Sequence, residues 1–148
     1  MHFTNYRVVL DTNVVVGAGS QWLDHGAPSP DKNIYRRVLI RIAEAHTGLY
    51  SGKVVGEYLE KLVDLGHRRE RALKLMTYIM GAFSRVKITT KSAPVSPSDP
   101  DDEVFLLCAI DGHADYLISE DHALNSLKSD YTKPMIGRCR ELAATFGE

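Results

Sequence analysis

The sequence predicts a three-layer α/β/α fold with a central parallel sheet of about five short strands. Short apolar segments alternate along the chain with stretches of helical periodicity, which is the order produced when helices connect parallel strands. The first apolar segment, Tyr6–Leu10, is short and β-branched, as is typical of a strand that helices cover on both faces. With 148 residues, of which 44% are hydrophobic and 25% charged, the chain has the length and composition of one globular domain over residues 1–148.

The segments that follow the first strand continue this alternation. Residues 17–33 are rich in Gly, Ser, Pro and Asp and predict a loop, in which Trp22 and Leu23 form the only apolar pair. Apolar residues at helical spacing then predict a helix over residues 34–46. Leu49-Tyr50 predicts a short second strand.

Two helices are predicted after this second strand. Ser51 is a good N-cap for a helix that runs to about Leu65, because its hydroxyl can accept a hydrogen bond from a free N–H of the first turn. Residues 68–83 predict the next helix, and four of its apolar residues are expected to face inward: Leu73, Met76, Ile79 and Met80.

The last part of the chain contains the clearest helix start. Val86–Thr89 predicts a strand, and a Pro- and Ser-rich linker follows it. Asp99 is then the expected N-cap of a helix with Pro100 at its first position, which ends near Gly112. The remaining predicted elements are a strand over 116–119, a short helix over 123–127, a strand over 135–136 and a helix over 138–146.

Charge is distributed unevenly, although the net charge is only −1. Residues 32–91 hold 13 Lys and Arg against 5 Asp and Glu, a net charge of +8. Residues 99–130 hold 9 Asp and Glu against one Lys, a net charge of −8. An acidic site beside a basic half suits a protein that holds cations and attracts a polyanion, but two solvated surfaces would give the same distribution.

Four acidic residues far apart in the chain are expected to aim at one point: Asp11, Glu57, Asp102 and Asp121. Asp11 and Asp121 fall at or just past the carboxyl ends of predicted strands, where parallel sheets bind their ligands. Glu57 lies within the helix that Ser51 caps, and Asp102 lies in the first turn of the helix that begins at Asp99. Taken singly, Asp102 and Asp121 could serve only as helix-terminal residues, and Glu57 as a solvated one.

Carboxylates that are brought together repel one another unless a cation neutralises them. Four oxygen ligands without a competing Cys or His cluster favour Mg²⁺ or Mn²⁺. Such an ion can lower the pKa of its bound water and polarise a phosphoryl oxygen, so a metal-dependent phosphodiester hydrolase is the leading hypothesis.

The sequence favours a cytoplasmic protein. Its two cysteines suggest no disulfide framework, which agrees with a reducing compartment. Its longest apolar run is far shorter than the roughly 20 residues of a membrane helix, and its N-terminus lacks the apolar segment of a signal peptide. We therefore expect no membrane association.

Three segments together resemble the PIN-domain nucleases, and most closely the branch described as toxin components of toxin–antitoxin systems. They are VVLDTNVVV, GEYLEKL and DPDDEVFLLCAIDGHADYLISEDHAL, which span most of the chain. The last is the most specific, because it joins an acidic helix start, an apolar helix, an Ala-Asp-Tyr strand and a hydroxyl residue two positions before an Asp. The resemblance implies a PIN-like parallel sheet and cleavage of RNA with Mg²⁺ or Mn²⁺.

The resemblance also implies roles for individual residues. Asp11, Glu57, Asp102 and Asp121 match the four acidic positions of the family in order, and so are the expected catalytic and metal-binding residues. Asn13 and Ser119 match polar residues that support the site. Two departures from the family bear on these roles. The 17–33 loop looks longer than usual, and Asp99 or Asp101 could share the metal role assigned to Asp102.

RNA and protein partners follow from the same hypothesis. Four arginines are candidate contacts for RNA phosphates: Arg36, Arg37, Arg68 and Arg69. The resemblance implies a cognate antitoxin that could place a basic side chain among the carboxylates, and a homodimer is expected, with the apolar face of helix 68–83 as one candidate surface.

Two other functions stay open at this level. An RNA- or partner-binding module with little or no catalysis would fit the same fold, although the presence of all four acids argues against it. A phosphatase would usually carry a second Asp two residues after its nucleophile, where this chain has Asn13.

Overall fold

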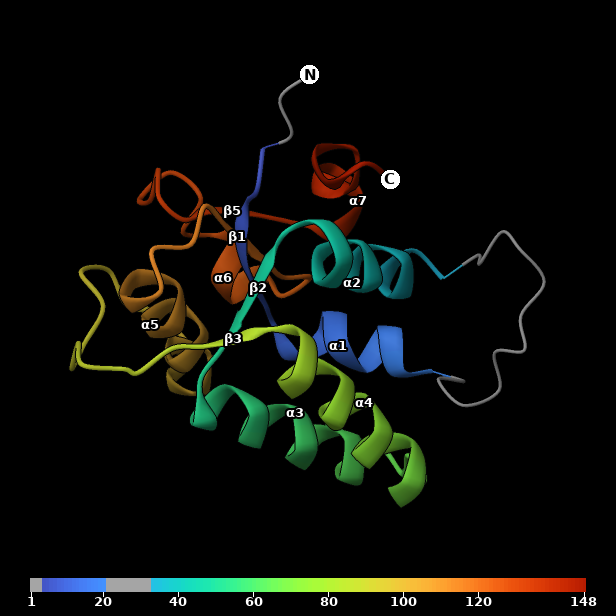
Figure 1. The fold of residues 1–148 in the computed structure, drawn as a ribbon. Helices are drawn as coiled ribbons and strands as arrows, with labels where there is room; N and C mark the ends of the chain where they lie inside the picture. The colour runs from blue at the N-terminus through green and yellow to red at the C-terminus, as the bar shows by residue number, and fades with distance from the viewer. Residues whose placement is uncertain (1–3, 21–32) are drawn as a thin grey trace.

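The computed structural model describes residues 4–20 and 33–148 and contains a five-stranded, all-parallel sheet (Figure 1). The strand order is β3-β2-β1-β4-β5. The bounds are β1 Arg7–Leu10, β2 Thr47–Tyr50, β3 Ser84–Arg85, β4 Tyr116–Ile118 and β5 Met135–Gly137. The predicted fold class, a three-layer α/β/α arrangement, is confirmed.

Helices cover both faces of the sheet. The α-helices are α1 Thr12–Gly19, α2 Ile34–Ala45, α3 Gly52–Asp64, α4 Arg69–Ala82, α5 Glu103–Asp111, α6 His122–Asn125 and α7 Cys139–Leu142, with 3₁₀ turns at Pro100–Asp102 and Ala143–Phe146. In Figure 1, α1 and α2 lie on one side of the strands and α5 lies on the other, while α3 and α4 run beneath α1. No helix within residues 4–20 and 33–148 is long and apolar enough to cross a membrane.

Across the sheet, the chain order of the strands runs backward from β3 to β1 and forward from β4 to β5, so it reverses between β1 and β4. This reversal sets the position of the site. Leu10 of β1 lies opposite Ile118 of β4, and the next amide, Asp11 N–H, donates to the Ile118 carbonyl at 2.9 Å. The carboxyl ends of the two strands are therefore level. Open α/β sheets bind ligands in the crevice at such a reversal, so residues that follow Leu10 and Ile118 enter one crevice.

The central strand β1 pairs with β2 and β4 at its edges and is covered by apolar packing on both faces. Val8, Val9 and Leu10 are fully buried, and burial of each such side chain contributes about 1.5–3 kcal/mol. Tyr58 of α3 is also fully buried and donates its hydroxyl to the Leu10 carbonyl at 2.5 Å. This bond ties α3 to the end of β1, directly beside Asp11.

The strand predicted over Val86–Thr89 is wrong. The third strand is Ser84–Arg85, and residues 86–90 follow it without regular structure. Because β2 turns into α3 after Tyr50, the Val86 N–H that donates to the Tyr50 carbonyl at 2.7 Å is the last backbone bond to that strand. Asp111 instead accepts the N–H groups of Thr89 and Thr90 at 2.7 and 2.9 Å.

The loop predicted over residues 17–33 begins too early, because α1 continues to Gly19. The glycines in α1 serve close packing: an added Cβ on Gly17 would lie 2.8 Å from the Tyr35 ring, and one on Gly19 would lie 2.8 Å from Leu75. The helix itself was not anticipated. Residues 21–32, including Trp22 and Leu23, lie outside the described residues.

Two of the four residues expected to face inward from α4 are exposed. Leu73 is 47% exposed and Met80 50%, whereas Met76 and Ile79 are buried as predicted. The buried stripe of α4 is Ala72, Leu75, Met76 and Ile79, which follows the i, i+3, i+4, i+7 spacing of one helix face. The final helix is also shorter than predicted, since α7 ends at Leu142 and a 3₁₀ turn completes the segment.

Candidate metal centre

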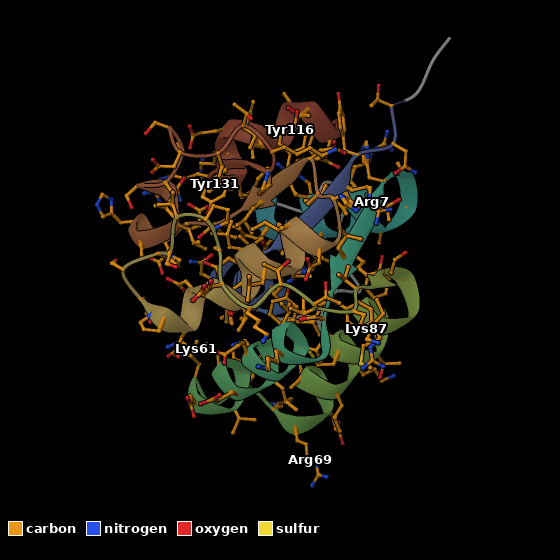
Figure 2. All side chains as sticks on the ribbon, turned by 90° about the vertical axis from the view of Figure 1, so that its left-hand side faces the viewer. Arg7, Lys61, Arg69, Lys87, Tyr116 and Tyr131 are labelled. Carbon is orange, nitrogen blue, oxygen red and sulfur yellow. The ribbon has the colours of Figure 1, made fainter. Side chains whose placement is uncertain are left out.

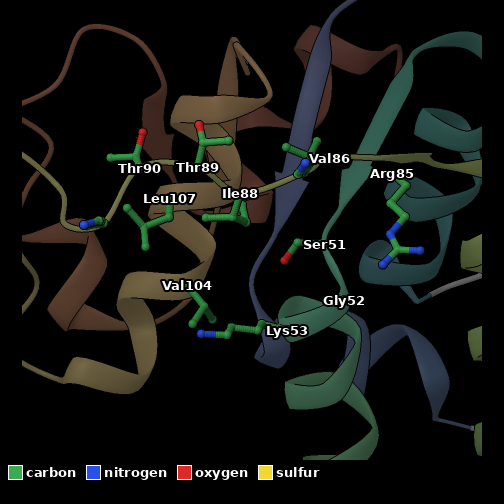
Figure 3. Close-up of a pocket in the computed structure, with 12 residues that line it drawn as sticks. Ser51, Gly52, Lys53, Arg85, Val86, Ile88, Thr89, Thr90, Val104 and Leu107 are labelled. Carbon is green, nitrogen blue, oxygen red and sulfur yellow. The ribbon is translucent and has the colours of Figure 1, made fainter.

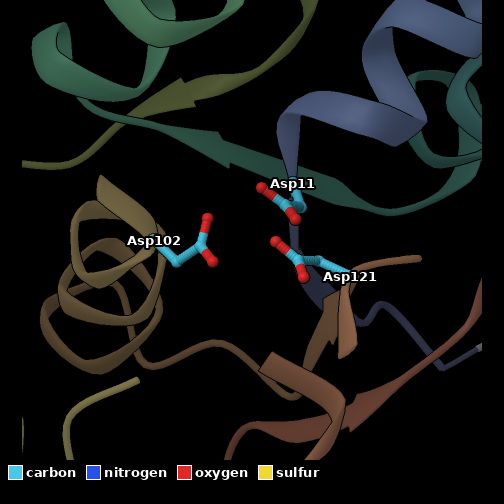
Figure 4. A group of neighbouring side chains, drawn as sticks. All are labelled: Asp11, Asp102 and Asp121. Carbon is cyan, nitrogen blue, oxygen red and sulfur yellow. The ribbon is translucent and has the colours of Figure 1, made fainter. Parts of the chain in front are cut away.

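Three carboxylates from distant parts of the chain converge at the reversal between β1 and β4. One oxygen from each of Asp11, Asp102 and Asp121 lies within 4.8 Å of the other two. Figure 4 shows the three side chains pointing toward one another from the end of β1, the start of α5 and the start of α6. Within the described chain, no Lys, Arg or His forms an ion pair with any of them.

Asp11 is fixed by two hydrogen bonds. It is the N-cap of α1, where Oδ1 accepts the Thr12 N–H at 2.7 Å, and Oδ2 accepts the Ser119 hydroxyl at 2.6 Å. The residue is 2% exposed. Burial raises the pKa of Asp11, while its bonds to Ser119 and Thr12 act in the opposite direction. Asp11 is therefore a rigid, poorly solvated carboxylate.

Ser119 also holds the backbone of Asp121. Its Oγ accepts the Asp121 N–H at 2.9 Å, and Asp121 Oδ1 accepts the Ala123 N–H at 3.0 Å as the N-cap of α6. Asn13 contributes from α1, where its Oδ1 accepts the Glu120 N–H at 3.1 Å. Ser119 thus bonds a carboxylate directly, whereas Asn13 positions the turn that carries Asp121.

Asp102 is the carboxylate with an unsatisfied oxygen. It is 8% exposed, and its Oδ2 is buried without a hydrogen-bond partner. Burial, contact with Asp121 and the charge of Asp11 raise the pKa of Asp102 to about 8. A buried carboxylate in this state requires either a proton or a cation, because the negative charges around it oppose ionisation.

The neighbouring acids of the 99–102 segment lie differently. Asp99 is exposed and accepts the Asp101 N–H at 3.0 Å as the N-cap of the 3₁₀ turn. Asp101 is exposed and lines the adjoining cavity. The three-carboxylate group includes Asp102 and neither Asp99 nor Asp101.

Glu57 lies on another wall of the same cavity, which has a volume of about 510 Å³. All four predicted acids line this cavity, and Glu57 is the one that does not belong to the close group. Burial and the charges of Glu60 and Asp101 raise the pKa of Glu57. Three further residues of α3 line the cavity and were not singled out from the sequence: Glu60, Lys61 and Asp64. Their i+3, i+4 and i+7 spacing from Glu57 was the signal that could have found them.

The four predicted RNA-binding arginines lie outside this cavity. The prediction for Arg36 conflicts with its placement: it is 5% exposed, and its guanidinium donates to the carbonyls of Ala18, at 3.2 Å, and Ser20. The guanidinium thus donates hydrogen bonds inside the fold, and these bonds connect α2 to the end of α1. Arg37 pairs with Glu148 at 3.4 Å.

Arg68 and Arg69 are exposed where α4 begins. Figure 2 shows Arg69 at the end of the molecule opposite Tyr116 of β4. They remain candidate surface contacts, away from the carboxylates.

The donor set fits a hard divalent cation. Carboxylate oxygens are the ligands that Mg²⁺ and Mn²⁺ prefer, and a cation would satisfy the unpartnered Oδ2 of Asp102. Asp11, Asp102 and Asp121 are the residues that could hold it. Without a cation, protonation of Asp102, whose pKa is raised to about 8, would relieve the same repulsion.

Comparison with known protein families places these residues in a wider group. The family model described as PIN domain matches residues 7–123, a range that contains all four acids. PIN domains are generally nucleases and typically use a divalent metal. Among curated proteins, no sequence matches this chain.

Proposed function

This chain belongs to the PIN domain family, and we propose that it is a metal-dependent endoribonuclease that hydrolyses RNA phosphodiester bonds. One observation carries the proposal: three carboxylates, none paired with a cation among residues 4–20 and 33–148, converge in a cavity at the sheet's reversal point, and one of them has a buried, unsatisfied oxygen. Such an arrangement is costly for folding unless it binds a cation. The cost supports a functional role for the site.

Mg²⁺ or Mn²⁺, held by Asp11, Asp102 and Asp121, would supply charge neutralisation at the phosphate and a water of lowered pKa. Ser119 keeps Asp11 oriented and, through the Asp121 N–H, keeps two of the carboxylates at a fixed separation. Glu57 faces the same cavity with a raised pKa, so its carboxylate is suited to orient the attacking water or accept its proton.

The test is cleavage of a mixed pool of structured RNAs by the purified protein in EDTA, Mg²⁺ or Mn²⁺. We expect cutting that requires the metal and disappears in Asp11→Asn, while the exposed control Asp101→Asn cuts nearly as well as the unmodified protein. RNA binding without cleavage in any metal would contradict the proposal. It would instead support the alternative, an RNA- or partner-binding module.

We further propose that the protein is the cytoplasmic toxin of a toxin–antitoxin pair. The proposal rests on the resemblance to that branch and on the carboxylate group, which would attract a basic side chain of an inhibitor. Expression in a bacterial host should arrest growth, and the Asp11→Asn variant should not. Normal growth with soluble, RNA-cleaving protein would favour a housekeeping nuclease.

A homodimer is proposed through the exposed apolar residues of α4. Leu73 and Met80 are about half exposed and lie seven residues apart on α4, which places them on one face of the helix, where a second copy would cover both. Sedimentation of the protein and of Leu73→Gln/Met80→Gln tests this. A monomeric mass for the unmodified protein would exclude it.

A further inference from the structure

A second cavity, the basic groove, lies beside the acidic one. Four cationic side chains line it, Lys53, Arg85, Lys87 and Lys91, and none of the lining residues that the structure describes is acidic. Its volume is about 730 Å³. Figure 3 shows Lys53 extending toward Val104 from the start of α3, with Arg85 at the opposite side of the groove.

The cations of the basic groove form no ion pair with the acidic side chains that the structure describes. All four cations are exposed, and within the described chain none of them takes part in an ion pair. The carboxylate of Asp111 lies near, but it accepts hydrogen bonds from the backbone of Thr89 and Thr90 instead. Four unpaired cations around one concavity attract a polyanion.

The segment that carries Lys87 and Lys91 is held in place. Asp111 at the end of α5 also accepts the Thr90 hydroxyl at 2.5 Å, so three hydrogen bonds attach this segment to the helix. Val86 is 8% exposed and packs into the core. The wall of the basic groove is therefore pre-formed, which lowers the entropy lost when a ligand binds.

The floor of the basic groove is apolar. Val86, Ile88, Val104 and Leu107 line it, beneath the cationic rim. A rim of cations over an apolar floor suits a single strand of nucleic acid, whose phosphates reach the rim while an unpaired base or a ribose contacts the floor. In a duplex the bases are stacked and paired, so they could not reach this floor.

The basic groove and the acidic cavity share their walls. Lys53 and Glu57 are four residues apart on α3, which separates them by about 6 Å along the helix axis. On α5, Val104 faces the basic groove and Phe105 faces the acidic cavity. A nucleic-acid strand positioned at the carboxylates can therefore continue into the basic groove over a distance of about one turn of α3.

We propose that the basic groove binds the single-stranded RNA that flanks the cleaved bond. This inference rests on the proposed nuclease function and specifies its substrate: an unpaired strand, held mainly through its phosphates. Among the described residues, no aromatic side chain lines the basic groove, so we expect little preference for particular bases.

The test compares two charge-matched double variants of the full chain. Lys87→Gln/Lys91→Gln removes two charges from the basic groove, and Lys74→Gln/Arg140→Gln removes two from exposed sites on α4 and α7. Binding of a fluorescein-labelled oligouridylate is measured in EDTA at several salt concentrations. We expect the groove variant to bind several-fold more weakly, and the slope of log affinity against log salt to become shallower by about 1.4. The control variant should bind as the unmodified protein does.

Cleavage of the same oligouridylate in Mg²⁺ or Mn²⁺ provides the second readout. The groove variant should show a raised KM with kcat nearly unchanged, because its carboxylates are intact. Equal binding by the groove and control variants would overturn the inference, even if cleavage still depends on Asp11. If the unmodified protein cuts no RNA but the groove variant still binds oligouridylate more weakly, the RNA-binding role of the groove would hold and the proposed nuclease function would be refuted. Binding of polyglutamate is measured in the same way. If the groove variant lost polyglutamate binding but bound oligouridylate as the unmodified protein does, the inference would be overturned in favour of an acidic protein partner.

Discussion

The hydroxyl of Ser119 donates a 2.6 Å hydrogen bond to Oδ2 of Asp11, although 108 positions separate the two residues. The same oxygen of Ser119 accepts the N–H of Asp121 at 2.9 Å. Ser119 is fully buried, so water does not compete directly for its hydroxyl in the folded structure. One side chain thus fixes the relative positions of two of the three carboxylates.

Substitution Ser119→Ala should therefore impair the site more than the fold. Loss of its two bonds leaves buried polar groups unsatisfied, which costs about 1–3 kcal/mol of stability. Loss of a residue that orients a metal ligand typically lowers metal affinity or activity by about 10–100-fold. Titration with Mn²⁺ and RNA cleavage measure both effects. Ser126→Ala, at an exposed hydroxyl that bonds only the Ala123 carbonyl, is the control and should change neither.

Asp102→Asn should abolish cleavage and raise the thermal stability of the metal-free protein. Beside Asp11 and Asp121 the buried Asp102 carboxyl must take up a proton when the metal-free protein folds, whereas the amide is already neutral, so the variant is more stable in EDTA. Thermal unfolding of both proteins in EDTA measures the difference. Asp101→Asn should have a small effect on cleavage, and a loss equal to that of Asp102→Asn would transfer the metal role to Asp101.

The raised pKa of Asp102 predicts a pH dependence of stability in EDTA. A carboxyl whose pKa rises on folding, here from 3.8 to about 8, holds its proton more tightly in the folded state. Its contribution is complete below the unfolded pKa and is lost as pH rises toward 8. The stability difference between unmodified protein and Asp102→Asn should therefore widen, to the variant's advantage, from pH 5 to pH 8. A difference independent of pH would show that Asp102 ionises normally.

Glu57→Gln should separate water activation from metal binding. Glu57 lines the cavity outside the close carboxylate group, so Mn²⁺ affinity at that group should change little while kcat falls. Calorimetric titration with Mn²⁺ and RNA cleavage rates make the comparison. A large loss of Mn²⁺ affinity would instead make Glu57 a ligand of the principal ion.

Two glycines with different surroundings test the packing around the sheet. A Cβ on Gly48 of β2 would lie 2.5 Å from three ring atoms of Phe83, so Gly48→Ala should destabilise the protein by about 1–3 kcal/mol through overpacking. Gly56 of α3 has no atom within 4 Å of the same position. Gly56→Ala should stabilise by about 0.5–1 kcal/mol, because alanine favours the helix. Urea unfolding measures both, and equal effects would contradict this packing.

Several local features follow from the sequence because they depend on nearby residues. Ser51 caps α3 by accepting the Val54 N–H, and Asp99 caps the turn before α5, both as predicted. A cap requires only a side-chain oxygen two or three residues before a free N–H. The parallel sheet follows in the same way from alternating strand and helix patterns.

Contacts between distant segments decided the rest. Arg36 is a charged residue of the type that usually lies on the solvated face of a helix. In the fold it is buried instead, and its guanidinium donates to two carbonyls at the end of α1. Val86–Thr89 has the β-branched pattern of a strand, but β2 ends before it can pair, and Asp111 takes the N–H groups of Thr89 and Thr90. Local pattern expresses preferences of about 1 kcal/mol, which such tertiary bonds override.

The amino-acid pattern alone places Asp11, Asp102 and Asp121 at the ends of strands or the starts of helices, and Glu57 within a helix. The fold brings one oxygen from each of the three aspartates within 4.8 Å of the others, leaves Glu57 on another wall of the cavity, and selects Asp102 rather than Asp101 for the group. The cause is the reversal of strand order between β1 and β4. It brings together chain segments whose separation along the sequence carries no information about distance, and it leaves their carboxylates to be neutralised by a cation or a proton.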